Sequence, residues 1–432
     1  MAYAAFRVRL ILCVALAVAA PVGVAAVVPA SLQQAIAGAA AGATIDVPPG
    51  VHHVHLTLAK PITLAGQPGA VLDGGGTGTV LRILASHVAV RGLTIRHSGA
   101  DLTTEDSGIY VAPKVEDVTL VHNRLEDVLF GVYLDGPSRV LVKDNTIIGM
   151  RQLRSPNRGD GIHLWNDTRC VISGNDVSHT RDGIYVYVSP GNLIEGNTIH
   201  DVRYGVHYMY SQPDTLRGNV SFHNVAGFAL MASNHLTVTD NRAYDNASYG
   251  MLLNYVNYSL VKGNLIGDTK GQFRPDGQVV PGAAGKAIFV YLSNGNVFTQ
   301  NLIADSRIGI HITAGSVDNR VYDNAFVRNR TQVFYVQNVE EDWSWKGRGN
   351  YWSDYDGWNF NGDGIGVVPY RPNDGVDVLM WKYPDAKLLL SSPAILLMRY
   401  VQRAFPVFAP GGLVDNHPLM QLPAVWRKAG HG

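Results

Sequence analysis

The stretch that decides the fold is LIEGNTIHDVRYGVHYMY, residues 193–210. Apolar and polar residues alternate in two short runs within it, and Gly and Asn stand where the runs meet turns. Alternation with a period of two is typical of strands that bury one face. The β-branched and aromatic residues in the runs also favour strands over helices. We therefore interpret this stretch as short strands joined by tight turns.

This unit repeats along the 432-residue chain. Asparagines equivalent to Asn197 recur at intervals of 22 or 23 residues, with two longer intervals of 30 and 37 residues. Glycines equivalent to Gly205 keep the same period, and Ala287 replaces one of them. A fixed period in the low twenties is typical of a solenoid whose repeats stack on one another. The asparagines are Asn123, Asn145, Asn175, Asn197, Asn219, Asn241, Asn264, Asn301 and Asn324, and the glycines are Gly108, Gly131, Gly161, Gly183, Gly205, Gly227, Gly250 and Gly309.

The period predicts an all-β fold, a right-handed parallel β-helix of roughly a dozen coils, each of about 22 residues and rising about 4.8 Å. We expect the asparagine side chains to stack and to hydrogen-bond to one another and to the turn backbone. We expect the glycines to allow turn conformations that residues with a β-carbon resist. Both roles are structural, so neither set of residues is expected to be catalytic.

The ends of the chain differ from the repeats. Arg7 and Arg9 precede a short apolar run, which is typical of a cleaved secretory signal. Ser31 is a good N-cap for a short amphipathic helix that would cover the first coil. The predicted segments are a signal peptide at 1–26, the parallel β-helix at 27–336, an aromatic Gly-rich capping region at 337–387 and an apolar docking tail at 388–432.

Composition narrows the class of protein. Charged residues make up 16% of the chain and its formal net charge is zero, which disfavours a nucleic-acid-binding protein. Removal of the signal would take Cys13 away and leave Cys170 as the single cysteine, so no internal disulfide is expected. We expect a protein exported to the periplasm of a bacterium.

Two insertions interrupt the period, at 150–158 and 268–285. In both cases the extra residues follow the asparagine and precede the next glycine marker, so both loops leave the same corner of a coil. Loops confined to one face often frame a binding site. Neutral growth of surface loops is the alternative.

The coils between these loops carry the candidate metal ligands. Positions two and four after each marker glycine should point outward, because positions one and three are apolar. They place His207 and Met209 on one strand and Met231 on the next, and His163 holds the position of His207 in an earlier coil. Thioether and imidazole are soft ligands that suit Cu(I). A partner-binding surface or an ordinary stacked face are the alternatives.

The same face also permits a sugar-binding interpretation. Trp165 and several tyrosines would form a platform for sugar rings, and Asp160 and Asp182 would supply charge. Asp before Gly is however ordinary turn chemistry. No pair of carboxylates lies at sequence positions that by themselves indicate a catalytic site, so we expect the chain not to be an enzyme. The platform tyrosines are Tyr110, Tyr133, Tyr185 and Tyr187, and the accompanying basic residues are Arg181 and Arg203.

Beyond the repeats, an aromatic block GRGNYWSDYDGWNFNGDGIGVVPY occupies 347–370. An apolar segment at 388–410 follows it, but Pro393, Arg399 and Arg403 make it a poor transmembrane span. It is interpreted as an element that docks on another protein. A helix packed back on the solenoid is the alternative.

The signal, the coils, the NYWSDYDGW and GDGIGVVPY motifs and the tail ending in DNHPLM together resemble the NosD family. The resemblance covers nearly the whole mature chain, and its specific part is the block from 350 to 370 with the tail.

The resemblance implies a periplasmic accessory protein of nitrous oxide reductase. Such proteins work with an ABC transporter and help to assemble the copper–sulfide centre of the reductase. Residues 388–410 would dock on the membrane subunit of the transporter. The outer face near His207 and Met231 would contact the reductase or a copper chaperone, with copper as the metal that it handles.

Overall fold

The structure is a computed structural model that describes residues 31–269, 271, 285–313, 315–335, 340–373, 376–377, 383, 392–404 and 412–427. The predicted signal peptide, most of the second insertion loop and both ends of the 388–410 segment lie outside the described residues. Among the described helices, none is both long and apolar enough to cross a bilayer.

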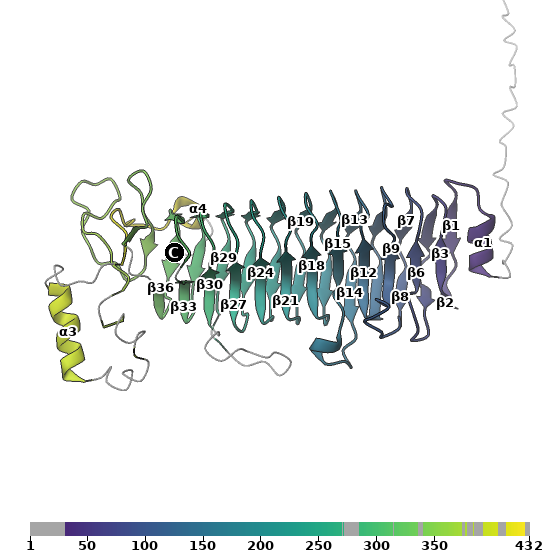
Figure 1. The fold of residues 1–432 in the computed structure, drawn as a ribbon, viewed down its shortest axis with the longest axis horizontal. Helices are drawn as coiled ribbons and strands as arrows, with labels where there is room; N and C mark the ends of the chain where they lie inside the picture. The colour runs from purple at the N-terminus through teal and green to yellow at the C-terminus, as the bar shows by residue number, and fades with distance from the viewer. Residues whose placement is uncertain are drawn as a thin grey trace, which may run out of the picture.

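Successive coils stack into an elongated parallel β-helix with three sheets along its sides (Figure 1). This confirms the predicted parallel β-helix. The first sheet comprises β1 (Thr44–Val47), β4 (Thr63–Gly66), β7 (Ala89–Arg91), β10 (Thr119–Val121), β13 (Leu141–Lys143), β16 (Val171–Ser173), β19 (Leu193–Glu195), β22 (Thr215–Arg217), β25 (Thr237–Thr239), β28 (Leu260–Lys262), β31 (Val297–Thr299) and β34 (Arg320–Tyr322). The second comprises β2 (Gly50–His53), β5 (Ala70–Asp73), β8 (Thr94–Arg96), β11 (Arg124–Val128), β14 (Thr146–Gly149), β17 (Asp176–Ser178), β20 (Thr198–His200), β23 (Val220–Phe222), β26 (Arg242–Tyr244), β29 (Leu265–Gly267), β32 (Leu302–Ala304), β35 (Ala325–Val327) and β38 (Tyr351–Trp352). The third comprises β3 (Leu56–Leu58), β6 (Leu81–Ile83), β9 (Ser107–Val111), β12 (Phe130–Asp135), β15 (Ile162–Trp165), β18 (Asp182–Tyr187), β21 (Tyr204–Met209), β24 (Ala226–Met231), β27 (Tyr249–Asn254), β30 (Lys286–Tyr291), β33 (Ile308–Ile312) and β36 (Thr331–Tyr335).

Each coil has three strands, although the alternation in 193–210 suggested two runs. This stretch forms β19, β20 and β21. The corner between β19 and β20 is a single positive-φ residue, Gly196 at +63°, followed by Asn197. Asp201, at +55°, lies in the second corner. At the first corner Glu195 and Gly196 lie between the buried Ile194 and Asn197, so the alternation slips by one residue. Gly and Asn mark the corner in the sequence, but the pattern did not show that it divides one run into two strands.

The asparagines form the predicted ladder. The backbone N–H and the side-chain amide of each one donate to the Oδ1 of its equivalent in the next coil, at 2.8 to 3.1 Å from Asn123 to Asn324. Asn350 continues the ladder by accepting from Asn324. The row is buried, so each amide satisfies corner groups that water cannot reach.

The marker positions require glycine for a different reason from the predicted one. None of them has a positive φ. A Cβ on Gly183 would instead lie 2.6 Å from the carbonyl oxygen of Gly205 and 2.2 Å from the Cγ2 of Ile199. The same close approach to the next coil recurs at Gly161 and Gly227. These positions hold glycine because the backbones of adjacent coils nearly touch there.

Separate elements lie at the two ends of the solenoid (Figure 1). At the first end lies α1 (Leu32–Gly38), with the Oγ of Ser31 accepting from the Gln34 N–H and Ile36 buried. At the other end Trp352 stacks on Phe326, with ring centroids 4.3 Å apart, and on Tyr370, at 4.6 Å. These rings cover the hydrophobic interior of the last coils.

Part of the predicted docking tail belongs to this end structure. In β39 (Leu413–Val414) the chain pairs with β37 (Glu341–Asp342), and Asp415 accepts from the Asn350 N–H at 2.7 Å and the Trp352 Nε1–H at 2.8 Å. The next helix, α4 (Ala424–Arg427), buries Trp426 against the solenoid. Of the described residues in this tail, α3 (Pro393–Ala404) exposes a large apolar surface, whereas 412–427 pack back on the coils.

Replacing Asn219 with Ala tests the ladder. The change leaves the Asn197 donors and the Ile194 carbonyl without partners in a buried corner. We expect the free energy of unfolding to fall by about 2–5 kcal/mol, measured by guanidinium denaturation followed by circular dichroism. Asn361→Ala, at an exposed position, is the control, and an equal loss in both variants would contradict the ladder's role.

Replacing Gly183 with Ala tests the close approach of the coils. Its Cβ would press on backbone, which cannot move without shifting the next coil. We expect a lower denaturation midpoint, corresponding to about 1–3 kcal/mol. The control is Gly38→Ala, where a Cβ meets nothing within 4 Å and φ is not positive. A stable Gly183 variant would show that the spacing is not the constraint.

Candidate metal-binding face

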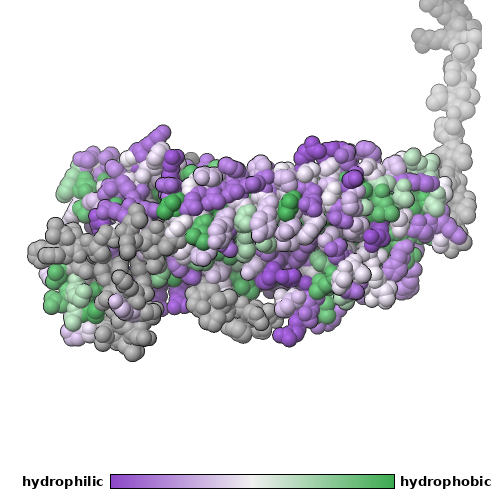
Figure 2. Space-filling model, viewed as in Figure 1, coloured by the Kyte–Doolittle hydropathy of each residue, from purple (hydrophilic) through white to green (hydrophobic). Residues whose placement is uncertain are grey.

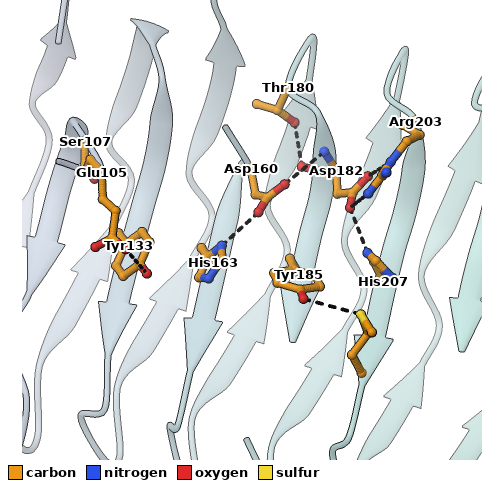
Figure 3. Close-up of polar contacts among 11 residues, drawn as sticks. Glu105, Ser107, Tyr133, Asp160, His163, Thr180, Asp182, Tyr185, Arg203 and His207 are labelled. Atoms are coloured by element: carbon orange, nitrogen blue, oxygen red, sulfur yellow. Dashed lines mark hydrogen bonds and ion pairs between the residues drawn. The ribbon is translucent and has the colours of Figure 1, made fainter. Parts of the chain in front are cut away.

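The candidate ligands lie on strands of the third sheet. Figure 3 shows the side chains of His163 and His207 on this sheet. Register places His207 beside Tyr185 on one side and Ala229 on the other. Met209 lies directly opposite Met231 on the adjacent strand. The predicted arrangement of two methionines on neighbouring coils, with His207 on the same strand face, is confirmed.

An aromatic column runs along this face and covers its histidines. The ring of His163 lies 4.5 Å from that of Tyr133 with an interplanar angle of 7°, and 4.9 Å from that of Tyr185. The ring of His207 lies 4.8 Å from that of Tyr185. Both histidines are only 7% exposed, whereas the sequence pattern predicted an exterior row. They do lie outside the coil, but stacking with adjacent coils shields them from water.

His207 is held by Asp182 of the preceding coil, which is paired with Arg203 of the same coil as His207. Its Nδ1 lies 2.8 Å from the Oδ2 of Asp182, and Arg203 contacts the same carboxylate at 2.8 and 2.5 Å. Burial raises the pKa of Asp182, but the hydrogen bonds from His207 and Arg203 outweigh this and lower it to about 2. An ionised carboxylate only accepts, so the His207 Nδ1 carries hydrogen and donates. In the neutral ring the Nε2 then presents its lone pair, and this buried atom has no hydrogen-bond partner.

His163 has an Asp partner of its own, within the same coil. Its Nδ1 lies 2.8 Å from the Oδ2 of Asp160, and its Nε2 is also buried without a partner. The strand of Tyr185 stands between the strands of His163 and His207. Two strand spacings amount to about 10 Å, while a metal–imidazole bond is about 2 Å long. His163 therefore does not share one ion with His207, Met209 and Met231.

The thioethers complete a soft donor set. Met209 and Met231 are both partly exposed, and the Met209 Sδ accepts a hydrogen bond from the Tyr185 hydroxyl at 3.4 Å. One imidazole with two thioethers suits Cu(I), and a carboxylate on the far nitrogen is the usual support for a metal-binding histidine. Among the described residues, no group of three or more His, Cys, Asp or Glu is placed to hold a metal. The residues present thus fit a soft metal and not a hard one.

The two Asp–His pairs were not predicted from the sequence. Asp160 and Asp182 were interpreted there as turn residues or as charges for a sugar site. Positions within the repeat could have indicated the second pair, because Asp182 directly precedes its marker glycine and His207 follows the marker glycine of the next coil by two residues. The parallel register places Asp182 opposite Tyr204, three residues before His207, and the His207 ring reaches back to it.

The first insertion loop folds over the neighbouring part of the column. Met150 and Leu153 pack with Phe130 and Tyr133, and the loop contains η1 (Ser155–Asn157). The Arg158 side chain fixes the loop by donating to the Leu153 carbonyl at 2.9 Å. The loop thus helps to bury the His163 end of the face. Residues 272–284 of the second loop lie outside the described residues.

Solved structures with a similar fold include two epimerase modules. The A-modules of the Azotobacter vinelandii mannuronan C-5 epimerases AlgE6 and AlgE4 superpose with TM-scores of 0.58 and 0.59. They share 16% and 15% identity with this chain, covering 70% of it and 89% and 91% of the modules. At such identities the likeness shows the fold alone.

Sequence comparisons are more specific. A protein named probable ABC transporter binding protein NosD from Stutzerimonas stutzeri is 48% identical over 377 residues, which are 87% of this chain and 86% of that protein. A protein of the same name from Pseudomonas aeruginosa is 50% identical over 370 residues, 86% of each chain. The family model described as periplasmic copper-binding protein (NosD) matches residues 146–357, a range that includes His163, His207, Met209 and Met231. This chain belongs to the NosD family.

Proposed function

We propose that this chain is a periplasmic accessory protein that works with an ABC transporter to assemble the copper–sulfide centre of nitrous oxide reductase. Copper is handled as cargo at the outer face of β21 and β24, where the reductase or a copper chaperone would also dock. The family description, periplasmic and copper-binding, and the names of the relatives support the coarse part of this proposal. The predicted signal at 1–26 agrees with export.

One observation carries the metal assignment. The Nε2 of His207 has no partner, its Nδ1 is fixed by an ionised Asp182, and Met209 and Met231 lie on the same face. Asp182 and Arg203 orient the imidazole, and the thioethers supply soft donors that bind Cu(I) without a redox change. The chain needs to perform no covalent chemistry in this role.

Replacing Met209 and Met231 together with Leu tests the metal assignment. Loss of both thioethers should weaken Cu(I) binding at least about tenfold, measured under anaerobic conditions by competition with a chromogenic chelator. Leu preserves volume, so the circular dichroism spectrum should not change. The matched control is Met251→Leu, because Met251 lies on adjacent β27 but is fully buried.

Unchanged copper affinity in the double variant would remove the metal assignment and leave the face as a partner-binding surface. The assembly role has its own test. Cells that carry only the double variant should accumulate nitrous oxide reductase deficient in its copper–sulfide centre, as judged by copper content and visible absorbance of the purified reductase.

The docking element is α3. It exposes Leu396 by 58%, Leu397 by 61%, Met398 by 42% and Tyr400 by 69%, while Ile395 packs on Val376. Figure 2 shows hydrophobic residues gathered at the end of the molecule where this helix lies. An exposed apolar helix suits a groove on a partner. We assign it to the membrane subunit of the transporter, as the central part of the 388–410 dock.

Introducing Glu at both Leu396 and Leu397 should abolish co-purification with the transporter, because two charges cannot enter an apolar groove. These substitutions test the dock more specifically than deletion of the tail, because the deletion would also remove Asp415 from the end of the ladder. Val51→Glu is the control, since Val51 is 48% exposed at the opposite end of the solenoid. Retained co-purification of the double variant would show that the dock lies elsewhere.

The alternative function is binding or processing of a polysaccharide. It is favoured by the stacked pair of Trp165 and Tyr187, with ring centroids 4.4 Å apart, beside the two Asp–His pairs. Trp165 is 37% exposed, as a platform for a sugar ring requires. Turnover of a uronate polymer by the purified chain would support this alternative over the carrier role.

A further inference from the structure

The Tyr185 hydroxyl occupies a position that the copper assignment does not explain. Its ring stands between those of His163 and His207, with centroids 4.9 and 4.8 Å away, so the ring is packed from both sides (Figure 3). A tyrosine hydroxyl carries its hydrogen at neutral pH. It is therefore a fixed hydrogen-bond donor.

The Tyr185 hydroxyl donates to Met209, which is one of the candidate metal ligands. Within the described part of the chain, the one hydrogen bond of the hydroxyl goes to the Met209 Sδ, at 3.4 Å. A thioether is a weak acceptor, and its lone pairs are the same electrons that it offers to a metal. A hydrogen bond to the sulfur either occupies the lone pair or withdraws density from it. Both effects lower the affinity of the sulfur for Cu(I).

We propose that Tyr185 sets the strength of the copper site by competing with the metal for the sulfur of Met209. The proposal rests on the proposed function and names how that site is regulated. His207 and Met231 offer their donor atoms without such competition, whereas Met209 must give up or share its hydrogen bond. Because stacking holds the tyrosine ring, the adjustment falls on the flexible methionine side chain.

The site therefore binds Cu(I) more weakly than one imidazole and two thioethers would without this hydrogen bond. A carrier must release its cargo to an acceptor, and release is faster when one of three ligands can return to a waiting hydrogen bond. Asp182 acts in the opposite sense on His207, because a carboxylate on the Nδ1–H makes the Nε2 a better donor. One ligand is thus strengthened and a neighbouring ligand weakened by residues of the same strand.

Replacing Tyr185 with Phe removes the hydroxyl and keeps the stacked ring. The variant should bind Cu(I) about two- to tenfold more tightly, the range set by the net worth of one hydrogen bond. The same factor should appear as slower release to an excess of chromogenic chelator in stopped-flow measurements. Tyr187→Phe is the matched control, since Tyr187 lies on the same strand opposite Met209 but is not its hydrogen-bond donor. Its affinity should not change.

A double-mutant cycle shows whether the effect passes through the sulfur. In a Met209→Leu background, Tyr185→Phe should have no effect on Cu(I) affinity or release. Unchanged or weaker binding by Tyr185→Phe alone, or a gain that persists without Met209, would overturn the proposal. If the unmodified protein binds no Cu(I), the proposed function itself fails. Normal binding by the unmodified protein with no response to Tyr185→Phe refutes only the competition.

Discussion

Hydrogen bonding between equivalent asparagines is the interaction on which the rest of the structure depends. Each buried amide accepts from the coil before it and donates to the coil after it, so a shift of one residue in any coil would break two rungs. The ladder therefore fixes the register of all three sheets. Fixed register in turn decides which side chains become neighbours, since parallel strands bring equivalent positions within about 4.8 Å.

The candidate site is a product of that register. Asp182 and His207 are 25 residues apart, and Met209 and Met231 are 22 apart, yet each pair meets because the coils are aligned. The charged pair of Asp182 and Arg203 then sets the state of the imidazole, and the aromatic column keeps water from it. Rigid coils thus supply the pre-organisation that a donor set needs, without any dedicated metal-binding loop.

Periodicity alone was enough to predict the solenoid, the asparagine ladder and the pairing of Met209 with Met231. It did not reveal that the corner at Gly196 separates two strands, because the alternation slips there by only one residue. It also misjudged the exposure of His163 and His207, since stacking between coils is not encoded within one repeat. The marker glycines were assigned to turns, but their constraint is contact with the following coil, which only coordinates reveal.

The last acceptor of the ladder comes from far along the chain. Asp415 receives the Asn350 N–H across 65 residues, and burial raises the pKa of this carboxyl to about 6 despite four hydrogen bonds. Every other rung joins positions 22 to 37 residues apart in the sequence, so it depends only on the next coil. The final rung depends on a residue 65 positions further on. A chain that stopped before Asp415 would lack this rung, and its last coil would keep a frayed end that proteases can attack.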